Sequence, residues 1–62
     1  MQVIIKSVRT GDYITRVYGA HPPAIHTTSN RKFATRFANH AAAENFLRRH
    51  HITNLAFEIE GA

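Results

Sequence analysis

Basic residues outnumber acidic ones by eight to four in this chain of 62 residues, which gives a formal net charge of +4. Such an excess favours polyanionic partners, among them nucleic acid. Lysine and arginine can contact phosphates, and tyrosine can stack on a base. The strand pattern below places several such residues on one side of a sheet. We predict that this face contacts DNA or RNA through Lys6, Arg16, Tyr18, Lys32 and Arg36.

Two carboxylates on the same face would reduce its positive charge. Glu58 and Glu60 fall on the same face, where they can pair across strands with Arg36 or Arg16 and leave an ordinary solvated surface. The alternative function is a protein-interaction module, or an inhibitor of a host protein, that acts through a sheet edge or through residues 19–31. Free sheet edges and a small apolar core also favour a homodimer.

The five histidines do not have the spacing of a metal site. His50 and His51 are adjacent, so on a helix they point about 100° apart, and His40 lies nearly three turns before His50. The chain has no cysteine, which excludes a disulfide and a thiolate zinc site. We expect neither a metal nor a cofactor, because the negative end of a helix dipole accounts for histidines at its end.

No catalytic constellation is visible. Glu58 and Glu60 would lie about 7 Å apart along a strand, but nothing in the sequence implies a cleft beside them. Ser7 and Ser29 lack the context of an activated nucleophile, and no glycine-rich phosphate loop is present. A chain of this length rarely encloses a substrate pocket, so we expect a protein that is not an enzyme.

The N-terminal stretch Met1–Lys6 contains an apolar run of three residues before its lysine. Such a run is too short for a signal peptide or a membrane span, so no membrane partner is expected. The absence of cysteine suits a reducing compartment, and we expect the cytoplasm.

A hairpin is the clearest local structure in the sequence. Residues 2–9 and 13–18 are rich in β-branched residues, and Thr10-Gly11-Asp12 separates them. Apolar side chains occupy both alternating sets of positions in the first run, which predicts a central strand covered on both faces. Residues 19–31 contain Pro22-Pro23 and are expected to form a long connection, from which Ile25 contacts the core.

The second half of the chain alternates between strand and helix patterns. Residues 32–37 alternate with Phe33 on the apolar side and predict a third strand; the alternative is a helical turn over residues 29–33 that leaves only residues 35–37 as a strand. Asn39 can cap a helix over residues 40–50. Its apolar face comprises Ala42, Ala43, Phe46, Leu47 and His50. Residues 55–60 predict a last strand with Leu55, Phe57 and Ile59 inward.

These elements predict one α+β domain over residues 1–62, with a three- to four-stranded, mostly antiparallel sheet and one helix on one face. The run from Phe33 to Leu47, between a hairpin and a last strand, resembles small phage and prophage proteins. That resemblance implies an accessory protein that binds host or phage macromolecules. Three strands followed by a helix are also similar to the arm-site DNA-binding domains of phage-type integrases, although this chain adds an acidic strand after the helix.

Overall fold

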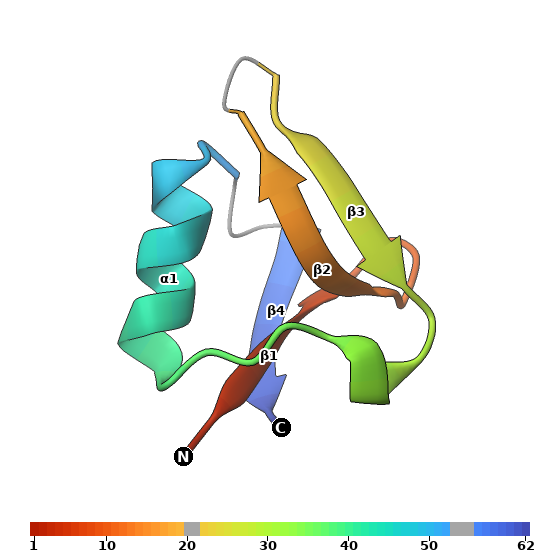
Figure 1. Cartoon of the computed structure of the whole chain (residues 1–62), viewed down its shortest axis with the longest axis vertical. Coiled ribbons are helices and arrows are strands. Elements are labelled where there is room, and N and C mark those ends of the chain that lie inside the picture. The colour runs from red at the N-terminus through yellow and green to blue at the C-terminus, as the bar shows by residue number, and fades with distance from the viewer. Residues whose placement is uncertain (20–21, 53–55) are drawn as a thin grey trace.

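The first strand of the chain lies inside the sheet rather than at its edge. The computed structural model describes residues 1–19, 22–52 and 56–62 and contains a four-stranded antiparallel sheet in the order β3-β2-β1-β4 (Figure 1). The helix α1 (His40–Arg49) packs on one face, which confirms the predicted α+β class. The strands are β1 (Val3–Ser7), β2 (Tyr13–Tyr18), β3 (Ala24–Thr28) and β4 (Phe57–Gly61).

Both faces of β1 are covered, as its sequence predicts. Val3 and Ile5 point toward α1 and pack with Ala43 and Leu47. Ile4 must point to the opposite face because side chains alternate along a strand, yet it is only 1% exposed. The reverse face of the sheet is therefore not bare at its centre.

The strands β1 and β2 diverge after their turn. Gly11 adopts a φ of +79°, a conformation that favours glycine, and the register pairs Lys6 with Tyr13. Farther from the turn, the chain segment 35–37 bonds to both strands. Its Thr35 amide donates to the Ile14 carbonyl (3.1 Å), and Phe37 exchanges two backbone hydrogen bonds with Val3 (2.8 and 2.9 Å). The strands β2 and β3 thus form a two-stranded arm that leans away from β1 and β4 (Figure 1).

The helix begins and packs as predicted. The Asn39 side chain accepts a hydrogen bond from the Ala42 amide at 2.8 Å, which satisfies a backbone donor that the first helical turn leaves free. Ala43 and Leu47 are buried, and the Phe46 ring packs against Phe37 with centroids 4.9 Å apart. A shallow, small-residue face of this kind lets a helix lie close to a sheet.

The expectation that residues 19–31 form a connection is wrong for residues 24–28, which are the edge strand β3. An edge strand bonds to a neighbour on one side only, so it tolerates Pro22-Pro23 immediately before it. Its β-branched residues suit a strand, and they outweigh the loop signal of the prolines. Ile25 lies opposite Val17 in the register, but it is 36% exposed and does not belong to the buried core.

The predicted strand over residues 32–37 is also wrong. A 3₁₀ helix, η1 (Arg31–Phe33), replaces its first half, which confirms the alternative of a helical turn within residues 29–33. An isolated bridge between Phe37 and Val3 replaces the rest. The physical reason is local, since the Asn30 side chain accepts from the Lys32 amide at 3.0 Å and turns the chain. Phe33 is consequently 70% exposed instead of facing the helix.

The last strand is present, with Phe57 and Ile59 packed against the core. Leu55 lies outside the described residues. Glu58 and Glu60 alternate with the inward residues and so point to the reverse face. Within the described part of the chain, no helix has the length and apolar character needed to cross a membrane.

Candidate nucleic-acid interface

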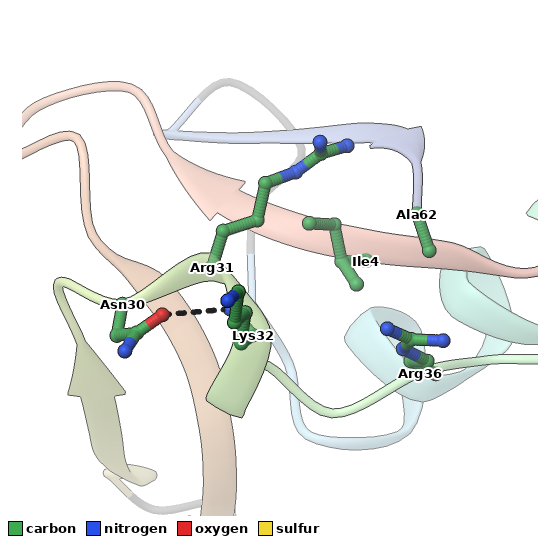
Figure 2. A pocket seen from close by; sticks show the side chains of 6 residues that line it. All are labelled: Ile4, Asn30, Arg31, Lys32, Arg36 and Ala62. Atoms are coloured by element: carbon green, nitrogen blue, oxygen red, sulfur yellow. Dashed lines mark hydrogen bonds between the residues drawn. The ribbon is translucent and has the colours of Figure 1, made fainter.

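A pocket of about 350 Å³ lies on the reverse face of the sheet, next to the buried side chain of Ile4. Figure 2 shows that Ile4 reaches it from β1, while the polar lining comes from the segment that carries η1. Three of the lining residues are cations that lie within six consecutive positions of the chain. The lining consists of Ile4, Asn30, Arg31, Lys32, Arg36 and Ala62.

Hydrogen bonds on both sides of η1 hold this segment in place. Asn30 caps its start through the Lys32 amide, and the Ala34 amide closes its end by donating to the Arg31 carbonyl at 3.2 Å. Ala34 is buried, and the Thr35 hydroxyl donates to the Thr15 carbonyl of β2. The backbone that presents the three cations is thus fixed before any ligand arrives.

The charges around the pocket are only partly compensated. The Arg31 Nε lies 3.7 Å from the Glu60 Oε1, and both side chains remain partly exposed. Arg31 also donates to the Gly61 carbonyl, so it lies along the end of β4. Among the described residues, Lys32 and Arg36 form no ion pair. Two cations and part of a third are available to an anion.

The structure brings together two of the five residues that the sequence predicts for the interface. Lys32 and Arg36 line the same pocket. Lys6 lies elsewhere, directly opposite Glu58 of β4 in the register. Opposite charges that face each other across antiparallel strands attract, so the Glu58 carboxylate offsets the charge of Lys6 on this face.

Arg16 and Tyr18 form a separate pair on the β2–β3 arm. The Arg16 guanidinium donates to the Tyr18 hydroxyl at 3.3 Å, and this hydrogen bond raises the pKa of Arg16 above its ordinary value. The Tyr18 ring meets His26 of β3 edge-on, with centroids 5.5 Å apart. Val17 lies between the two residues in sequence and packs on the core, so Arg16 and Tyr18 point away from the helix.

The acidic pair does not follow the expected alternative. Glu60 pairs with Arg31 rather than with Arg36 or Arg16. Arg31 was not among the residues predicted for the interface, because the predicted strand over residues 32–37 begins one residue after it. The sequence did carry a usable signal, since an Asn before Arg31-Lys32-Phe33 can cap a helical turn, and a turn places consecutive side chains around one axis.

Two of the histidines bond to neighbouring groups of the fold. His40 bonds to Glu44 one helical turn later, with 2.8 Å between Nε2 and Oε1. His50 lies 2.9 Å from the Gly19 carbonyl through its Nδ1 and stacks near Phe46. In residues 1–19, 22–52 and 56–62, no group of three or more His, Cys, Asp or Glu residues is arranged to hold a metal. His21 lies outside the described residues.

Comparison of the chain with family models, curated proteins and solved structures finds no match.

Proposed function

We propose that this chain is a small, non-enzymatic binding protein that holds the phosphate backbone of a nucleic acid in the pocket beside η1. The observation that carries the proposal is the convergence of Arg31, Lys32 and Arg36 around one hollow. Arginine suits this role because its planar guanidinium can donate two parallel hydrogen bonds to one phosphate. All three cations are exposed, so a phosphate can reach them without displacing any part of the fold.

The charge of the whole chain supports the same ligand. The net charge of +4 attracts polyanions over a range of about 10 Å at moderate salt. A phosphate that enters the pocket competes with Glu60 for Arg31, and the exposed geometry of that ion pair makes the exchange inexpensive. Arg16 and Tyr18 supply a second contact for a longer ligand from the β2–β3 arm.

Fluorescence anisotropy with short labelled DNA and RNA tests the proposal. The variant Arg31→Ala/Arg36→Ala removes two pocket cations, and its matched control Arg9→Ala/Arg48→Ala removes two exposed cations elsewhere. Both variants have the same net charge, so a difference between them reports the pocket. We expect the pocket variant to bind at least about tenfold more weakly than the control at low salt.

Two results would overturn the proposal. One is the absence of binding by the unaltered chain at low salt to every oligonucleotide. The other is an equal loss of affinity in the pocket variant and the control, which would show that net charge alone drives association. The circular dichroism of each variant confirms that the fold is intact.

The free edge of β3 favours a second candidate function, pairing with another protein strand. The Thr15 hydroxyl donates to the His26 carbonyl at 3.0 Å, so that carbonyl points toward β2. Backbone groups alternate in direction along an antiparallel strand, which directs those of Ile25 and Thr27 to the open edge. The strand has no charged residue to prevent edge pairing. The simplest partner is a second copy of this chain.

Sedimentation equilibrium tests this second candidate. Thr27→Pro removes one outward N–H and should shift the chain toward the monomer, while Thr27→Val keeps the N–H and serves as its control. A chain that is monomeric at high concentration without any substitution would contradict the pairing of β3 with a second copy.

A further inference from the structure

Phe33 exposes its aromatic ring to solvent beside the basic pocket. Phe33 is 70% exposed, whereas large apolar side chains are usually buried. It is the last residue of η1 and directly follows Arg31 and Lys32, which line the pocket. Three residues complete a turn of 3₁₀ helix, so the Phe33 side chain leaves the turn in a direction different from both cations.

The backbone that carries this ring is held in place on both sides of it. The Phe33 amide donates to the Asn30 carbonyl at 3.0 Å, and the next residue, Ala34, is only 7% exposed. A ring carried on a held backbone loses little freedom when a ligand stacks on it, which favours binding. Exposure and restraint together make Phe33 a stacking platform rather than part of a mobile loop.

From this arrangement we infer that the ligand is a single-stranded nucleic acid whose unpaired base stacks on Phe33 while its phosphates occupy the pocket. The inference rests on the proposed function, since the pocket supplies the backbone contact. Bases inside a duplex are covered on both sides by their neighbours and offer no free face to a protein ring. Unpaired bases expose such a face. Proteins that bind single strands commonly combine aromatic stacking with a basic groove.

Two matched ligands separate stacking from backbone contact. One is a short oligothymidine, and the other is an abasic strand with the same number of phosphates and no bases. Phe33→Leu keeps an apolar side chain but removes the aromatic ring, and Phe33→Tyr keeps the ring as a control. The side chain is exposed, so neither substitution disturbs the core.

We expect Phe33→Leu to weaken oligothymidine binding by at least about fivefold, to leave abasic-strand binding unchanged, and to be rescued by Phe33→Tyr. The chain has no tryptophan, so Phe33→Trp adds a single reporter. Its fluorescence should be quenched by oligothymidine and not by the abasic strand.

If the unaltered chain binds both strands equally and Phe33→Leu changes neither affinity, the stacking role is refuted while the backbone contact stands. If the unaltered chain prefers duplex DNA to either strand, single-strand recognition is refuted. If it binds no oligonucleotide at low salt, the proposed function fails, and this inference fails with it.

Discussion

The salt dependence of binding provides a quantitative test of the pocket through Arg36. This residue lines the pocket and forms no ion pair within the described part of the chain, so its charge is fully available to a phosphate. Arg36→Ala removes one phosphate contact and leaves the other two cations in place. Arg9→Ala, in the exposed turn between β1 and β2, lowers the net charge equally and serves as the control.

The expected magnitude follows from counterion release. Each phosphate neutralised on a single strand contributes about −0.7 to the slope of log affinity against log salt concentration. Three pocket cations predict a slope of about −2, and Arg36→Ala reduces it to about −1.4. Between about 50 mM and about 200 mM salt, the unaltered chain should lose affinity about 18-fold and the variant about 7-fold.

Anisotropy titrations with labelled oligothymidine at several salt concentrations give these slopes directly. The Arg9→Ala control should lower affinity slightly and keep the slope of the unaltered chain. Equal slopes for Arg36→Ala and the unaltered chain would show that Arg36 contacts no phosphate. An equal change of slope in both variants would assign the effect to net charge rather than to the pocket.

Three further outcomes are expected. Glu60→Gln frees Arg31 and removes a charge that repels phosphate, so the affinity for oligothymidine at low salt should rise by up to about fivefold. An unchanged or lower affinity would contradict the partial compensation of Arg31 by Glu60. Leu47→Ala opens a cavity beside β1 and should lower the free energy of unfolding by about 2–5 kcal/mol in urea denaturation; a loss below about 1 kcal/mol would be inconsistent with its burial. Asn39→Ala leaves the Ala42 amide unsatisfied and should cost about 1 kcal/mol by the same measurement, while Asn39→Ser should retain most of the stability.

The fold could be predicted where a local pattern and the tertiary packing agree. The apolar residues at both sets of positions in β1 require cover on two faces, and the structure supplies α1 on one and the η1 segment on the other. The helix was predictable because Asn39 stands directly before a run with a clear apolar face. The resemblance to phage proteins and the cytoplasmic location stay predictions.

Pattern alone did not decide the structure of residues 19–37, although the alternative of a helical turn over residues 29–33 did include η1. The prolines marked a loop, but an edge strand needs hydrogen bonds on one side only, and β2 provides them. The alternation of Phe33 and Phe37 marked a strand, but the Asn30 cap diverts the chain into η1. The hydrogen bond to the Asn30 side chain favours the helical turn over the strand.

The residue pattern alone predicts the central strand, the amphipathic helix and the excess of cations that an anion site requires. Which of these cations lie together depends on the folded path of the chain. Arg31 joins Lys32 and Arg36 because the chain turns at Asn30 and crosses beside Ile4, while the strand register places Lys6 opposite Glu58. Periodicity fixes the side of an element on which a residue lies, but proximity between elements depends on the path of the chain, which many distant contacts set together.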